Sequence, residues 1–334
     1  MRIRVKVKTL ALFLVALVAV VTVAACGANQ LRNEPSPTAD GRTIQHAMGE
    51  TVVPQMPERV VLLWSAVDAL ALGVEPAGAV LLASPPIIGD EATPMFSDRT
   101  EGIAAVGNFA QPNLETIVEL QPDLILGTTL AESFYPRLVQ IAPTVIVDIS
   151  GGPAAWKEHV LEAATAFGKP DEAQALIQQY EQRIAQFQQA MGDRLNNTTV
   201  SVARFDTDRI RIYQKDSLPG VVLAEAGLPR PESQQQNNHD EIISLESLPS
   251  IDGDVLFFVQ DNPEASTLAK AQESQLWSQL DVVQRGQVHE VSAEVWFLNL
   301  GIVSAHMILN DLFRTLVPDG EQYVIHQVGE LPLP

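Results

Sequence analysis

Several side chains at the expected ends of strands could bind the oxygen atoms of a small molecule. The main candidate is Arg204, which follows the apolar run Val200–Ala203 in the phrase VARF. A guanidinium group offers a planar fork of donors that suits carboxylate or hydroxamate oxygens. The other candidates, which could pack against or bond to the same ligand, are Trp64, Asn108, Phe109, Tyr213 and Trp296.

Each of these residues also has an ordinary structural explanation. Arg204 could be a surface residue of a hairpin that pairs with Asp206, and Arg211 could simply face solvent from the next strand. Tyr213 and Trp296 could belong to the core, because large aromatic side chains are commonly buried. The sequence leaves these alternatives open.

The sequence contains none of the common catalytic motifs. It has no G-x-S-x-G, no P-loop, no G-x-G-x-x-G and no H-E-x-x-H. Its six histidines are scattered, and no two of them have a metal-binding spacing. The run Asn237–Glu241 includes possible metal ligands around His239, but its composition is typical of a solvated loop. The absence of these motifs does not exclude catalysis, but it leaves no mechanism to argue from these residues, and we expect no metal ion to be held by the protein's own side chains.

The elements that must position the candidates occur in two similar halves. Each half has a helix-capping residue, then a first-turn Glu and, eight residues after that Glu, an Asp that leads an apolar strand. These residues are Asn113, Glu115 and Asp123 in the first half and Ser244, Glu246 and Asp254 in the second. The copies lie about 131 residues apart, which is too far for a solenoid repeat. The pattern predicts two related lobes.

This repeat resembles the most recognisable segment of periplasmic substrate-binding proteins of the iron-siderophore and cobalamin class, which feed ABC importers. The resemblance includes the phrases VARF and IRIY, at Arg204 and Arg211, and spans residues 42 to about 317. In that family the first-turn Glu of each lobe docks onto arginines of the membrane permease. The resemblance implies this role for Glu115 and Glu246. Alternatively, each Glu merely complements the dipole of its helix.

The N-terminal residues indicate export. Four basic residues precede the apolar run Leu10–Val23, as in a signal peptide, and the run ends in Val23–Cys26, which is similar to a bacterial lipobox. Cys26 is the single cysteine, so it would carry the lipid and no disulfide can form. A membrane-spanning anchor is the alternative, but the apolar run is short for a bilayer. We expect lipid attachment to the outer side of the cytoplasmic membrane.

The chain is strongly acidic, with 21 basic and 41 acidic residues and a formal charge of −20. Without the four basic residues of the signal peptide, the charge is −24. Such a surface is repelled by nucleic acid and by anionic lipid, so we exclude both as partners. An anionic ligand would need a local cluster of arginines that acts against this field.

Alternation of strands and helices predicts an α/β fold with two Rossmann-like lobes and mainly parallel sheets. A helix of roughly 30 Å from Asp171 to Arg194 would join them, and the ligand cleft would lie between the carboxyl ends of the sheets. The expected domains are the signal peptide 1–25, a flexible tether 26–41, the N-terminal lobe 42–153, a helical segment with the connector 154–195, and the C-terminal lobe 196–334.

The resemblance implies the solute-binding component of an ABC importer, which captures a ferric siderophore and delivers it to the permease dimer. The iron would be liganded by the siderophore, and the protein would be a monomer that contacts the membrane through its lipid alone. Haem or cobalamin, carried by the same family, is the first alternative ligand. A binding protein for free zinc or manganese and an envelope enzyme are more distant alternatives.

Overall fold

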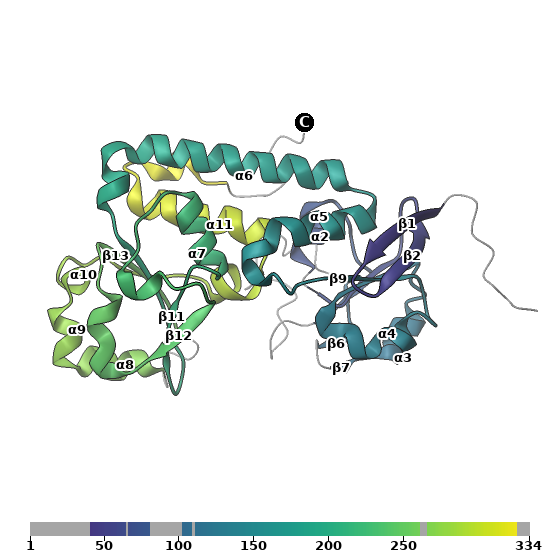
Figure 1. The fold of residues 1–334 in the computed structure, drawn as a ribbon, viewed down its shortest axis with the longest axis horizontal. Coiled ribbons are helices and arrows are strands. Elements are labelled where there is room, and N and C mark those ends of the chain that lie inside the picture. The colour runs from purple at the N-terminus through teal and green to yellow at the C-terminus, as the bar shows by residue number, and fades with distance from the viewer. Residues whose placement is uncertain (1–40, 65, 81–101, 109–110, 261–265, 326–334) are drawn as a thin grey trace, which may run out of the picture. The chain divides into compact units, whose positions relative to one another are not determined.

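The computed structural model describes residues 41–64, 66–80, 102–108, 111–260 and 266–325 (Figure 1). The predicted signal peptide, the expected lipidation site Cys26, most of the tether and the candidate Phe109 lie outside the described residues.

The first lobe is built on a parallel sheet with the strand order β5-β4-β3-β8-β9. All residues of β8 and β9 are buried, as expected for parallel strands that are covered on both faces. The strands are β3 (Val60–Leu62), β4 (Gly78–Ala79), β5 (Ala104–Ala105), β8 (Leu124–Thr128) and β9 (Thr144–Val147). The helices are α2 (Val67–Ala71), α3 (Leu114–Glu119), η2 (Thr129–Phe134) and α4 (Tyr135–Leu138).

Two short antiparallel pairs accompany this sheet. The first is a hairpin of β1 (Gly41–His46) and β2 (Gly49–Pro54). A smaller pair, β6 (Gly107–Asn108) and β7 (Gln111–Pro112), leads into α3.

The second lobe contains a mixed sheet with the strand order β12-β11-β10-β13-β14. The predicted antiparallel pair of β10 and β11 is confirmed, whereas β10, β13 and β14 are parallel. The strands are β10 (Val200–Phe205), β11 (Ile210–Tyr213), β12 (Asp240–Ile243), β13 (Val255–Gln260) and β14 (Val288–Glu290). The helices are α7 (Leu218–Glu225), η5 (Glu232–Gln234), α8 (Thr267–Glu273), α9 (Gln275–Gln279), α10 (Asp281–Gln284), η7 (Glu294–Leu298), α11 (Ile302–Leu316) and η8 (Gly320–Tyr323).

The expectation of a solvated loop over Asn237–Glu241 was wrong at its end. Glu232–Gln234 forms the short helix η5, and the polar residues Asp240 and Glu241 begin the edge strand β12. This strand pairs antiparallel with β11, which lies about thirty residues earlier in the sequence. Local composition did not reveal the strand because the backbone groups that hold it come from β11.

A long helix joins the lobes, as predicted. After η3 (Gly152–Ala155), α5 (Trp156–Phe167) ends at Gly168, whose φ of 78° is left-handed and suits glycine. The connector α6 (Pro170–Met191) follows and is roughly 33 Å long at 1.5 Å per residue. It packs against α5 and α11 (Figure 1), and its buried Arg183 donates to Asn310 Oδ1 at 2.6 Å. The short helix η4 (Gly192–Asn197) then leads into β10.

The repeated Asp residues make equivalent contacts in the two lobes. Asp123 accepts hydrogen bonds from the backbone N–H groups of Glu58 and Arg59, at 2.8 and 2.9 Å, just before β3. Asp254 accepts one from Thr199 N at 2.8 Å, just before β10. Each carboxylate therefore ties the start of its own strand to the start of the neighbouring parallel strand.

The helices that precede these Asp residues differ between the lobes. In α3, Asn113 Oδ1 accepts from Thr116 N at 3.2 Å and caps an α-helix, as predicted. The second copy is a 3₁₀ helix, η6 (Leu245–Ile251), which contains Pro249 and whose Ser244 makes no capping bond. Proline lacks the backbone N–H that an α-helix would need at this position.

Candidate ligand-binding site

Two arginines lie side by side at the carboxyl end of β10. Arg204 on β10 and Arg211 on β11 are direct cross-strand partners, so their side chains emerge on the same face of the sheet. The carboxylate of Asp206 holds both: its Oδ1 is 2.9 Å from Arg204 Nε, and its Oδ2 accepts from Arg211 Nε at 2.8 Å. We use the name arginine pair for Arg204 and Arg211 together with Asp206, the carboxylate that they share. Asp240 lies at the edge of this group, with its Oδ2 4.0 Å from Arg211 Nη1, so the two cations have two carboxylates within ion-pair distance.

The arginine pair is only partly accessible to solvent. The exposed fraction of the side chain is 16% for Arg204, 25% for Arg211 and 9% for Asp206. Burial by itself would lower the pKa of Arg211, but the hydrogen bond with Asp206 and the charges nearby raise it on balance. Both guanidinium groups are therefore charged, fixed in direction and partly shielded from water, which strengthens their attraction for an anion.

An aromatic wall borders the arginine pair. Tyr213 at the end of β11 stacks on Phe297, with ring centroids 4.1 Å apart, and meets His239 edge-on at 5.4 Å. Burial raises the pKa of Tyr213, while the charges of Arg211 and Arg204 and a hydrogen bond with Arg204 oppose that rise. The phenol is therefore neutral at physiological pH and joins the polar network of the arginines.

Of the predicted second-lobe residues, Arg204 and Tyr213 come together, and Trp296 packs against Phe257 of β13. Arg204 does pair with Asp206, as the alternative explanation required, but it is largely buried and shares Asp206 with Arg211. Tyr213 is 1% exposed and Trp296 is fully buried, with its indole N–H donating to Asp311 Oδ2 at 2.8 Å. Their roles toward a ligand stay predictions.

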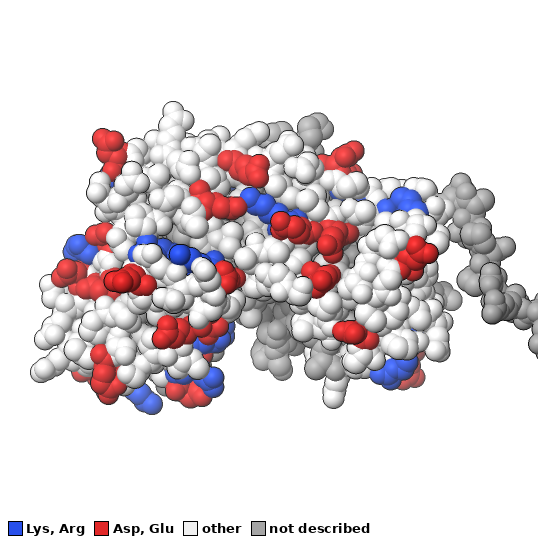
Figure 2. Space-filling view, in the orientation of Figure 1, with Lys and Arg blue, Asp and Glu red and all other residues white. Residues whose placement is uncertain are grey.

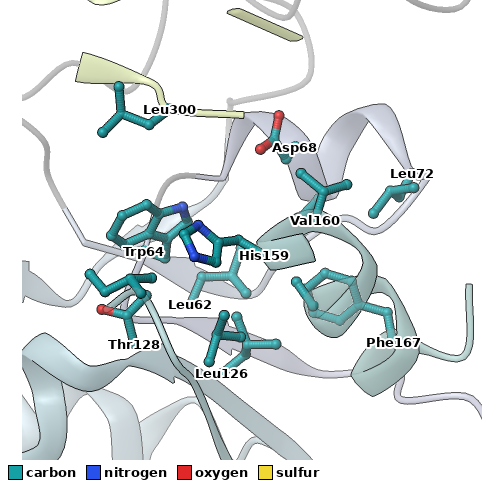
Figure 3. A pocket seen from close by; sticks show the side chains of 14 residues that line it. Leu62, Trp64, Asp68, Leu72, Leu126, Thr128, His159, Val160, Phe167 and Leu300 are labelled. Carbon is teal, nitrogen blue, oxygen red and sulfur yellow. The ribbon is translucent and has the colours of Figure 1, made fainter. Parts of the chain in front are cut away.

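The predicted first-lobe residues lie in two different places. Asn108 is exposed, and its Oδ1 accepts from Gln111 N at 2.9 Å within the turn between β6 and β7. Trp64, just beyond β3, lines a small pocket together with Thr128, His159 and Leu300 (Figure 3). This pocket has room for about 30 Å³, space for a water molecule or two but not for a chelate.

Asp68 lines the same pocket and contacts the start of α11. Its Oδ1 accepts from Val303 N at 3.2 Å, so the first-lobe helix α2 supplies an anion at the N-terminus of α11. Burial raises the pKa of Asp68 to about 6, although backbone hydrogen bonds from Val303 and Ile302 lower it. A Cβ atom at Gly301 would overlap the Asp68 carboxylate, so a larger residue there would displace that carboxylate from the start of α11.

Sequence reasoning missed two features of the site. The stacking of Phe297, in the π-helical turn η7, on Tyr213 was not predicted. Asp206 was considered only as a surface partner of Arg204 and is instead the common anchor of two arginines. Alternation along the predicted hairpin, with its turn at Thr207 and Asp208, could have placed Arg204 opposite Arg211.

The two repeated glutamates are exposed. Glu115 lies in the first turn of α3 and Glu246 in the first turn of η6. Neither carboxylate is buried, so both are available to a partner.

Within the described part of the chain, no three His, Cys, Asp or Glu side chains converge as they would around a metal ion. Among the described helices, none is long and apolar enough to cross a bilayer.

Comparison with known proteins shows the family. Residues 65–295 match the periplasmic binding protein family. The probable siderophore-binding lipoprotein YfiY of Bacillus subtilis is 35% identical over 322 residues, covering 91% of this chain and 97% of that protein. The achromobactin-binding periplasmic protein of Dickeya dadantii is 32% identical, covering 78% of this chain and 86% of that protein.

A solved structure supports the same family assignment. Staphylococcus aureus SirA complexed with staphyloferrin B has a TM-score of 0.71 and 30% identity, and the match covers 82% of this chain and 98% of that one. Fold and sequence similarity agree. The chain therefore belongs to the periplasmic binding protein family, as a two-lobed substrate-binding protein and not an enzyme.

Proposed function

We propose that this protein captures an anionic ferric siderophore between its two lobes and delivers it to an ABC permease. The observation that carries the proposal is the arginine pair, in which Asp206 fixes two guanidinium groups side by side at a strand end. The relatives named for achromobactin, staphyloferrin B and other siderophores support the same class of ligand. The ferric ion is the cargo, and the siderophore supplies its ligands.

The chemistry of capture follows from the arginine pair and the aromatic wall. Arg204 and Arg211 would donate charge-assisted hydrogen bonds to carboxylate or similar oxygens at the rim of the chelate. Because Asp206 already orients both side chains, little side-chain entropy is lost when the ligand binds. Phe297, stacked on Tyr213, would pack against the apolar part of the siderophore.

Delivery would use the two exposed glutamates. Glu115 and Glu246 have equivalent places in the repeated unit, and each would meet an arginine of the permease dimer. Export and attachment through a lipid on Cys26 would keep the monomer at the outer side of the cytoplasmic membrane, next to that permease. We further propose that the lobes comprise residues 42–153 and 196–334, joined by the helical segment 154–195.

Fluorescence titration of the four tryptophans tests the ligand class. The purified protein is titrated with ferric staphyloferrin B, ferric achromobactin, haem and cobalamin. We expect saturable quenching by at least one of the two ferric siderophores. Tight binding of haem or cobalamin, without binding of either siderophore, would replace the proposal with that ligand.

Two arginine variants test the site, and a third arginine supplies the control. Arg204→Gln and Arg211→Gln should each weaken binding of the ferric siderophore by about 1–3 kcal/mol, the usual contribution of a hydrogen bond to a charged group. Arg209→Gln should leave affinity unchanged, because Arg209 is exposed and bonds to the adjacent Asp208 at 2.8 Å. Equal affinities for all three variants and the original protein would remove the arginine pair from the site.

A further inference from the structure

A short link joins the aromatic wall to the start of α11. It consists of Asn299–Gly301, between η7, which carries Phe297, and the first residue of α11. Three residues span at most about 11 Å even when fully extended, so the link can absorb only a small shift. The place of Phe297 therefore depends on what holds the start of α11.

Asp68 of α2 holds the start of α11. Its Oδ1 accepts from Val303 N at 3.2 Å, and a second backbone hydrogen bond comes from Ile302. The residue at the N-cap position of α11 is Gly301, which has no side chain to cap the helix. Asp68 therefore supplies, from another helix, the acceptor that an N-cap side chain would normally provide.

The other two residues of the link are also fixed. Leu300 lines the small pocket together with Asp68 and Trp64, and Figure 3 shows all three side chains around it. Asn299 is 5% exposed, and its backbone N–H donates to Glu294 O at 2.9 Å, which closes the turn η7. The backbone from η7 to α11 is thus held along its whole length.

The surroundings of Asp68 differ from those of most acidic side chains on the surface. Figure 2 shows Asp and Glu side chains spread over the face drawn. Asp68 instead lines a pocket whose other lining residues are mainly apolar. A carboxylate in such a place is costly unless hydrogen bonds compensate it, and the first N–H groups of α11 supply them together with the positive end of the helix dipole. Asp68 and the start of α11 therefore stabilise each other.

We propose that Asp68 is a positioning residue for ligand binding, which fixes the start of α11 and, through the link Asn299–Gly301, the place of Phe297 in the aromatic wall. Phe297 stacks on Tyr213 with ring centroids 4.1 Å apart. Asp68 acts on the ligand only through this wall. The inference rests on the proposed function, because the place of Phe297 affects affinity only if the ligand binds at the wall.

Fluorescence titration with ferric staphyloferrin B and ferric achromobactin tests the effect on affinity. Asp68→Ala should weaken binding about three- to tenfold, which corresponds to the loss of one aromatic contact. Asp68→Asn should restore most of the affinity, because its amide oxygen can still accept from Val303 N. If Asp68→Ala does not fold, Gly301→Ala displaces the same carboxylate and should weaken binding in the same way.

Asn310→Ala is the matched control for a loss of stability alone. Asn310 also lies on α11, is 2% exposed and donates to Ile325 O at 2.8 Å, away from the start of the helix. This variant should keep the affinity of the original protein. Unchanged affinity in Asp68→Ala, or an equal loss in Asp68→Ala and Asn310→Ala, would overturn the proposal.

A double-mutant cycle shows whether Asp68 acts through Phe297. In a Phe297→Leu background, Asp68→Ala should reduce affinity by a smaller factor than in the original protein, because the contact that Asp68 positions is already lost. The same factor in both backgrounds would mean that Asp68 affects binding by another route, which contradicts the proposal.

Hydrogen exchange in the ligand-free protein separates this inference from the proposed function. The backbone amides of residues 294–299 should exchange faster in Asp68→Ala than in the original protein or in Asn310→Ala. Unchanged exchange would refute the positioning role, whichever ligand binds. Faster exchange, together with no siderophore binding by the original protein, would uphold the positioning of η7 and overturn only the proposed ligand.

Discussion

The contact of Asp68 with α11 predicts a specific dependence of stability on pH. Burial raises the pKa of Asp68 from 3.8 to about 6 in the folded protein. Between these two values the folded protein binds a proton that the unfolded chain has released. The stabilisation from this proton is complete at low pH and is lost as pH rises through 6. The total loss is about 3 kcal/mol, since each pKa unit corresponds to 1.36 kcal/mol.

The measurable part of this loss lies at moderate pH. Linkage gives a decrease of about 1.4 kcal/mol in the free energy of unfolding between about pH 5 and about pH 7.5. Asp68→Asn cannot titrate, and its amide oxygen can still accept a hydrogen bond from Val303 N. Urea unfolding of both proteins at the two pH values gives the difference. Because the comparison is between variants, titration of other groups, such as the half-buried His159 in the same pocket, cancels.

The expected result is that Asp68→Asn gains stability relative to the original protein as pH rises, by about 1.4 kcal/mol over this interval. An equal difference between the two proteins at both pH values would show that Asp68 titrates normally. In that case the carboxylate would not be buried against α11. If Asp68→Asn instead loses stability relative to the original protein as pH rises, the helix terminus lowers the pKa of Asp68 more than burial raises it.

Three further predictions concern the site, the partner and the junction near α11. Asp206→Asn should weaken siderophore binding about tenfold in the fluorescence titration, because two guanidinium groups lose their common anchor; tighter binding would mean that Asp206 competes with the ligand. Glu115→Arg combined with Glu246→Arg should abolish iron uptake by cells while the affinity of the purified protein is unchanged; a lost affinity would exclude a docking role. Gly301→Ala should lower the free energy of unfolding by about 1–3 kcal/mol through its clash with the Asp68 carboxylate, and by less in an Asp68→Ala background. Equal costs in both backgrounds would contradict that clash.

The lobes and their repeated unit could be predicted because their signals are local. Apolar runs bounded by turn residues mark β8 and β13, and the capping of α3 by Asn113 was readable from residue type alone. The connector α6 followed from the regular spacing of its apolar residues. The 3₁₀ form of η6 also has a local cause in Pro249, whose effect the sequence analysis did not apply.

The sequence by itself determined the two-lobed α/β fold, the exposed first-turn glutamates and the choice of Arg204 as the leading candidate. The tertiary structure decided which groups meet. It joined Arg211 and Asp206 to Arg204 and stacked Phe297 on Tyr213. Such contacts depend on register between strands and on packing of segments far apart in the chain, and residue type and spacing carry no direct record of either.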